Sequence, residues 1–103
     1  MAGYALSPAA RADLEEIWDH TVGRWGEAQA EFQIRNIQKA CEALSGGALV
    51  IRSAGDIRAG YRKAAVGSHV IYFRARSDAV EVVRILHRRM DVARHVRPSS
   101  GRP

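Results

Sequence analysis

The chain has 103 residues, a net charge of +5 and one cysteine. This length predicts a single domain, which we place at residues 1–97 with a flexible tail at 98–103, and one cysteine excludes an internal disulfide bond. No run of about 20 apolar residues occurs, so we expect no membrane contact. The first residues also lack the pattern of a signal peptide, which favours a cytoplasmic protein.

The charge is divided unevenly along the chain. Residues 1–45 carry four basic and seven acidic residues, whereas residues 46–103 carry twelve basic and four acidic ones. Fourteen of the sixteen basic residues are arginine, which suits planar contacts with carboxylate or phosphate. The second half therefore predicts a basic face for an anionic partner.

The first 45 residues predict a short strand followed by a helical hairpin. Residues 4–6 are apolar, and Ser7-Pro8 is typical of a helix start. Apolar residues then recur at three- and four-residue spacing to Trp25, with Asp13, Glu15 and Glu16 expected on the solvated face. A second helix is expected over residues 27–44, ended by Gly46-Gly47, with Cys41 as a small buried side chain.

The second half predicts strands. Residues 48–60 have no clean period and indicate a loop. Residues 61–66 and 69–76 alternate around Gly67-Ser68, a two-residue hairpin turn, and residues 79–87 are apolar enough for a strand inside the sheet. Residues 90–96 are expected to form a short C-terminal helical segment. The order is β-α-α-β-β-β: an α+β fold with a helical hairpin on one face of a small antiparallel sheet and the first strand at its edge.

Residues 83–96, VRILHRRMDVARHV, pass from an apolar strand into a cluster of arginine and histidine. Three hypotheses fit: a nuclease site with His87 as acid or base, a docking surface, or a solvated chain end. The four histidines show no metal-ligand spacing, and no phosphate-binding glycine loop or nucleophile elbow occurs, so we expect no metal site and no cofactor.

Three segments carry a resemblance to a known family: YALSPAARADLEEIWDHTVGRWG, DIRAGYRKAAVGSHVIYFR and VEVVRILHRRMDVARHV. Together they resemble the ParE toxins of the RelE/ParE superfamily, and the likeness spans residues 4–96. The resemblance implies the fold given above and a toxin of a type II toxin–antitoxin system. ParE toxins poison DNA gyrase, and a ParD antitoxin wraps them with its C-terminal segment.

The resemblance also implies that ParD binds the operator, so we expect no sequence-specific DNA binding by this chain alone. RelE-type relatives share the fold but cut messenger RNA on the ribosome, commonly with a tyrosine shortly after the last strand. Here that region reads Met90-Asp91-Val92-Ala93. The missing tyrosine favours a non-enzymatic gyrase inhibitor and leaves the ribosome-dependent mRNA endonuclease as the alternative; a toxin that has lost its toxicity is a third hypothesis.

Two groups of residues are the candidates for the two partners. We expect the target-binding surface for toxicity at Arg88, Arg89, Met90, Asp91, Arg94 and His95. We expect antitoxin contacts at Arg58, Tyr61, Arg62, Arg74 and Arg84, and on the helical hairpin around Leu14, Trp18 and Phe32. Trp18 also falls in the apolar stripe of its helix, which favours a core position, and Arg74 and Arg84 are expected to share a sheet face if the register places them opposite.

Overall fold

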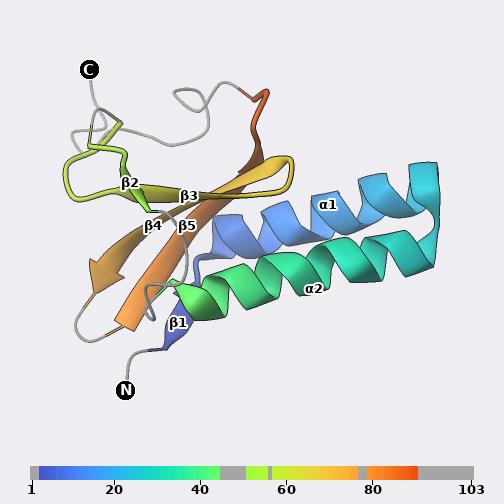
Figure 1. Cartoon of the computed structure of the whole chain (residues 1–103), viewed down its shortest axis with the longest axis horizontal. Helices are drawn as coiled ribbons and strands as arrows, with labels where there is room; N and C mark the ends of the chain where they lie inside the picture. The colour runs from blue at the N-terminus through green and yellow to red at the C-terminus, as the bar shows by residue number, and fades with distance from the viewer. Residues whose placement is uncertain (1–2, 45–50, 56, 77–78, 91–103) are drawn as a thin grey trace.

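The structure is a computed structural model that describes residues 3–44, 51–55, 57–76 and 79–90. Its elements follow the order β1 (Tyr4–Leu6), α1 (Pro8–Trp25), α2 (Glu27–Ala43), β2 (Arg52–Ser53), β3 (Arg62–Val66), β4 (His69–Arg76) and β5 (Ala79–His87). Figure 1 shows the two helices side by side, with the turn that joins them at the far end of the hairpin from β1. The predicted α+β architecture is confirmed.

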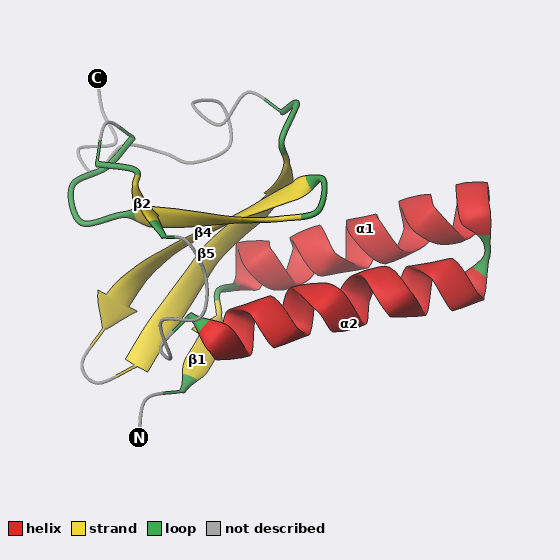
Figure 2. Cartoon of the chain, in the orientation of Figure 1, coloured by secondary structure: helices red, strands yellow, loops and turns green. Residues whose placement is uncertain are grey.

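The sheet has five strands in the order β1-β5-β4-β3-β2 (Figure 2). β1 runs parallel to β5, with Tyr4 opposite Val80, whereas the other neighbours are antiparallel. The prediction that β1 pairs at the sheet edge and that β5 lies inside the sheet is confirmed. The expectation of an antiparallel sheet is wrong for β1. β2 runs opposite to β1, and the three antiparallel pairings from β2 to β5 bring β5 back to the direction of β1.

Local sequence signals account for the element boundaries. The Ser7 hydroxyl accepts a hydrogen bond from the Ala10 backbone N–H at 3.0 Å and donates one to the Val83 carbonyl at 2.7 Å. It therefore caps α1 and ties its start to β5. Gly26 adopts φ +94° between the helices, a conformation that disfavours other residues. Gly67, at φ +60°, opens the predicted two-residue turn between β3 and β4.

Two apolar clusters lie on opposite faces of the sheet. Because side chains alternate along a strand, Ile71 and Phe73 face the helices, where they pack with Ile37, while Tyr72 faces the other way. On that second face, Tyr72 packs with Tyr61 in a smaller cluster. Part of the predicted loop 48–60 covers this cluster and contributes β2, which the sequence pattern did not predict because it has only two residues.

Several predictions of burial can now be compared with the structure. Cys41 is buried as expected, at 2% exposure. Trp18 is 37% exposed and Trp25 is 68% exposed, so the core position favoured for Trp18 is wrong. Asp13, expected on the solvated face, is buried at 6% exposure. The expected helical segment at 90–96 lies, beyond Met90, outside the described residues, as does the tail at 98–103. No helix in the described ranges is long and apolar enough to cross a membrane.

Candidate functional site: a histidine pocket and a helical groove

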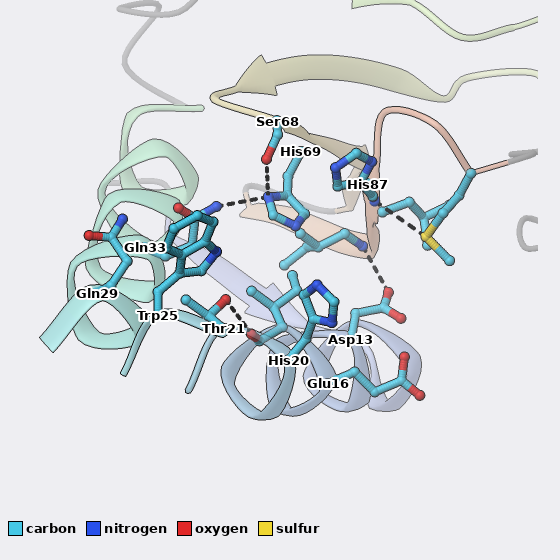
Figure 3. A pocket seen from close by; sticks show the side chains of 14 residues that line it. Asp13, Glu16, His20, Thr21, Trp25, Gln29, Gln33, Ser68, His69 and His87 are labelled. Atoms are coloured by element: carbon cyan, nitrogen blue, oxygen red, sulfur yellow. Dashed lines mark hydrogen bonds between the residues drawn. The ribbon is translucent and has the colours of Figure 1, made fainter. Parts of the chain in front are cut away.

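A pocket of about 500 Å³ lies between the helical hairpin and the ends of β4 and β5. Three imidazoles line it, from His20 on α1, His69 on β4 and His87 on β5, and we call it the histidine pocket (Figure 3). The other lining residues are Asp13, Glu16, Ile17, Thr21, Trp25, Gln29, Gln33, Ser68, Ile85, Leu86 and Met90. The pocket thus combines apolar walls with several hydrogen-bonding groups, the composition typical of a binding site.

His69 is held in a defined orientation by its neighbours. Its exposure is 8%, and the Gln33 side-chain amide lies 2.9 Å from Nδ1. In this arrangement the amide N–H donates and Nδ1 accepts, so the neutral ring carries its proton on Nε2. Burial, followed by the neighbouring imidazoles of His87 and His20, lowers the pKa of His69 below its ordinary value of 6.5. His69 is therefore neutral at pH 7.

His87 organises the turn that follows β5. Its Nδ1 accepts the Arg89 backbone N–H at 3.1 Å, and its carbonyl accepts the Met90 N–H at 2.9 Å. Its ring packs edge-on against His69, with centroids 5.5 Å apart at an interplanar angle of 79°. The Arg88 N–H also donates to the Ser68 carbonyl at 2.9 Å, which joins this turn to the β3–β4 hairpin. The prediction that His87 ends a strand is confirmed, and its hydrogen bonds hold the turn.

Asp13 and Arg84 form a buried ion pair beside the pocket. Arg84 donates from Nε and Nη2 to the two carboxylate oxygens at 2.7 and 2.8 Å. The Ile85 backbone N–H donates to Oδ2 at 2.9 Å. Since β1 pairs with β5 only as far as Val82, Asp13 satisfies a backbone group that has no strand partner on this side in the described part of the sheet. Arg84 therefore has a structural role.

The helical groove is a second, shallower hollow on the hairpin. It is lined by Leu6, Arg11, Leu14, Glu15, Trp18, Asp19, Ile34 and Gln38. Two of the three hairpin residues expected to contact an antitoxin, Leu14 and Trp18, lie in it. Phe32 is 59% exposed but does not line it. An exposed tryptophan in a groove is typical of a protein-binding surface.

The remaining residues expected to contact an antitoxin lie on β3, β4 and β5 and in the segment that precedes β3. Tyr61 is buried at 5% exposure beneath Arg58, whose guanidinium carbon lies 5.5 Å from the Tyr61 ring centroid. Arg74 lies opposite Glu81 and donates to it at 2.7 Å. The register places Arg74 opposite Glu81 and Arg84 opposite Tyr72, so the two arginines are not directly opposite each other. Because Tyr72 and Arg74 are two residues apart on β4, both arginines nevertheless belong to the same face of the sheet. Arg62 is exposed beside a shallow hollow lined by β2 and β3.

The predicted toxicity surface is described only in part. Arg88, Arg89 and Met90 are exposed in the turn after β5. Asp91, Arg94 and His95 lie outside the described residues. Among residues 3–44, 51–55, 57–76 and 79–90, no three His, Cys, Asp or Glu side chains come together in a way that could hold a metal ion.

Sequence reasoning missed the histidine pocket and the Asp13–Arg84 pair. Asp13 and Arg84 are 71 residues apart, and His69 and Gln33 are 36 apart. One local signal was available: Arg84 is a charged residue within an otherwise apolar strand, which requires a buried counter-charge or an exposed edge. This signal did not specify Asp13 as the partner.

Comparisons with known proteins agree with this fold. Residues 4–92 match the family model described as ParE toxin of type II toxin-antitoxin system, parDE. The chain is 47% identical over 94 residues to Toxin ParE1 of Mycobacterium tuberculosis, covering 90% of this chain and 96% of the relative. It is 38% identical over 96 residues to Toxin ParE1 of Caulobacter vibrioides, covering 93% and 99%.

A solved structure shares the fold. A chain of the chromosomal ParDE toxin–antitoxin system from P. aeruginosa superposes with a TM-score of 0.69 at 21% identity, covering 84% of this chain and 96% of that one. The family model spans most of the sequence, and the M. tuberculosis and C. vibrioides relatives are covered almost completely. This chain belongs to the ParE toxin family of type II toxin–antitoxin systems.

Proposed function

We propose that this chain inhibits DNA gyrase without acting as an enzyme, and that a ParD-type antitoxin neutralises it in the cytoplasm. The observation that carries the proposal is the ParE-type sequence over residues 4–92, including the turn that exposes Arg88, Arg89 and Met90. The two arginines offer planar hydrogen-bond donors to an acidic protein surface or to DNA phosphates held by a target enzyme. The hydrogen bonds that His87 accepts from the Arg89 and Met90 backbone N–H groups fix the backbone that presents the two arginines.

The helical groove supports an antitoxin as the second partner. Leu14, Ile34 and the exposed Trp18 give it an apolar floor, while Arg11, Glu15 and Asp19 supply charges. An amphipathic segment of a partner would bury the apolar residues and pair with the charged ones. The turn after β5 and the helical groove involve different residues, so an antitoxin segment in the groove leaves the side chains of that turn available to the target.

A supercoiling assay with purified chain and DNA gyrase tests the proposal. We expect supercoiling to fall and cleaved DNA to accumulate, because a ParE-type inhibitor traps the enzyme on broken DNA. The double variant Arg88→Glu/Arg89→Glu should restore supercoiling. If the native chain arrests growth in cells but leaves supercoiling unchanged in the assay, the gyrase proposal is wrong.

The endonuclease alternative is tested in parallel. His87 and the arginines beside it are the groups that would act on RNA phosphate, and primer extension on ribosome-bound message would reveal new 5′ ends. If the native chain cuts messenger RNA, the His87→Ala variant does not, and gyrase is unaffected, the endonuclease hypothesis replaces the proposal of gyrase inhibition.

A further inference from the structure

The histidine pocket has apolar residues at its rim and hydrogen-bond donors within. Trp25 is 68% exposed and Met90 is 39% exposed, and both line the pocket. Large exposed apolar residues around polar groups are typical of a surface that binds a protein segment. Met90 also belongs to the turn after β5, but neither that turn nor the helical groove accounts for the exposed Trp25 beside three imidazoles.

The buried ring of His69 lines this pocket with its Nε2–H donor. The Gln33 amide and the Ser68 hydroxyl both lie at Nδ1, at 2.9 and 3.5 Å, and no described residue accepts a hydrogen bond from Nε2–H, although His69 is only 8% exposed. A buried donor without a partner costs free energy, which a ligand acceptor would recover. Figure 3 shows the ring between Gln33 and His87, above His20.

The charges around the pocket permit an anion to enter. On α1, Asp13 is neutralised by Arg84 of β5, and Glu16 is an exposed carboxylate beside His20. α2 contributes only the uncharged amides Gln29 and Gln33, while the β4 and β5 ends contribute His69 and His87. The basic second half of the chain, with twelve basic and four acidic residues, adds a favourable long-range field.

We propose that the histidine pocket receives a carboxylate side chain of the antitoxin, which accepts a hydrogen bond from Nε2 of His69. Apolar neighbours of that acidic residue pack on Trp25 and Met90. The pocket volume of about 500 Å³ suits one acidic side chain with an adjacent large apolar one. This inference rests on the proposed antitoxin and adds a second anchoring point to the helical groove.

Carboxylate binding at an imidazole makes the affinity depend on pH. An anion stabilises the protonated ring, so the complex takes up a proton that the free chain lacks at neutral pH. Affinity should therefore rise as the pH falls from about 8 to about 6, the range in which histidine titrates. A pocket filled by a neutral side chain would not produce this proton uptake.

The key variant is His69→Asn. The asparagine carbonyl stands near the position of Nδ1 and can still accept from Gln33, but nothing replaces the Nε2–H donor. His69→Gln instead keeps a donor near Nε2 and cannot titrate. Trp18→Ala is the matched control, because it weakens the helical groove and leaves the imidazoles intact.

Calorimetric titration with the ParD-type antitoxin encoded beside the gene measures each variant at about pH 6 and about pH 8. We expect His69→Asn to weaken binding by about tenfold or more and to remove the pH dependence. His69→Gln should retain part of the affinity without the pH dependence. Trp18→Ala should weaken binding at both pH values and keep the pH dependence.

A second arm uses the free chain, with phenylacetate and its neutral analogue phenylacetamide as probes. Nitrogen NMR of the imidazoles should show His69 Nε2 shifting with phenylacetate and a rise in the His69 pKa, with little response to phenylacetamide. Circular dichroism checks that every variant is folded. If His69→Asn does not fold, the native chain's response to the two probes decides the question.

The outcomes separate the two proposals. No binding of antitoxin to the native chain overturns the proposed function. Tight binding that is unaffected by pH and by His69→Asn, with no difference between the two probes, overturns the pocket inference and leaves the antitoxin proposal standing.

Discussion

Asp13 of α1 and Arg84 of β5 form a two-point ion pair, 2.7 and 2.8 Å long, that fastens the helical hairpin to the sheet. Asp13 also accepts the Ile85 backbone N–H at 2.9 Å. The side chains of Asp13 and Arg84 are 6% and 19% exposed, so neither charge is well solvated in the folded state. Removing one partner leaves the other charge buried without compensation.

Asp13→Ala should therefore destabilise the chain by about 3–5 kcal/mol, measured by urea unfolding. Glu31→Gln is the control, because Glu31 pairs with Arg35 on the exposed surface of α2. That change should cost no more than about 0.5 kcal/mol. Similar losses for both variants would contradict the structural role assigned to Asp13.

The buried imidazole of His69 should make the stability depend on pH. Burial lowers its folded-state pKa below 6.5, so the unfolded chain binds protons more readily than the folded one. Its contribution to stability is complete above pH 6.5 and is lost as the pH falls below that value. The free energy of unfolding should decline less on acidification for His69→Asn than for the native chain; parallel pH curves would exclude His69 as the cause.

Two glycine-to-alanine changes should have opposite signs. Gly67 has φ +60°, and a Cβ there meets no atom within 4 Å, so only the backbone is strained. Gly67→Ala should cost about 1–2 kcal/mol. Gly23 lies inside α1, and a Cβ there also meets no atom within 4 Å. Gly23→Ala should therefore raise the free energy of unfolding by up to about 1 kcal/mol. Thermal unfolding measures both, and destabilisation by Gly23→Ala would contradict the open space found there.

The Cys41 thiol should be unreactive in the folded chain. It is 2% exposed, and burial raises its pKa to about 11. Since the thiolate is the reactive form, a disulfide reagent such as Ellman's should react negligibly at about pH 8 until urea unfolds the chain. The unfolded chain serves as the positive control, and rapid reaction under native conditions would show that this part of α2 opens.

The arginines after β5 should matter for toxicity and not for folding. Arg88→Glu/Arg89→Glu should relieve growth arrest in cells that lack the antitoxin, while the free energy of unfolding changes by about 1 kcal/mol or less. Arg35→Glu/Lys39→Glu makes the same change in charge on exposed positions of α2 and should leave arrest intact. A large loss of stability in the first double variant would instead assign those arginines to the fold.

The sequence by itself determined the elements with strong local signals. The boundaries of helices and strands follow from capping and backbone conformation at Ser7-Pro8, Gly26 and Gly67-Ser68. The change in the spacing of apolar residues separates the helices from the strands. The ParE-like segments then indicated the family, which the comparisons confirmed. These features depend on residues that are close together in the chain.

Only the tertiary structure decided which distant residues meet. Three features join residues that are far apart in the chain. They are the parallel pairing of β1 with β5, the ion pair of Asp13 with Arg84, and the pocket lined by His20, His69 and His87. The sequence does not show whether a charged or imidazole side chain is solvated or buried, because the groups that surround it come from helices and strands far away in the chain. Trp18 differs from its predicted core position for the same reason: it belongs to the apolar stripe of α1 but is 37% exposed, because α2 and the sheet do not cover that part of the stripe.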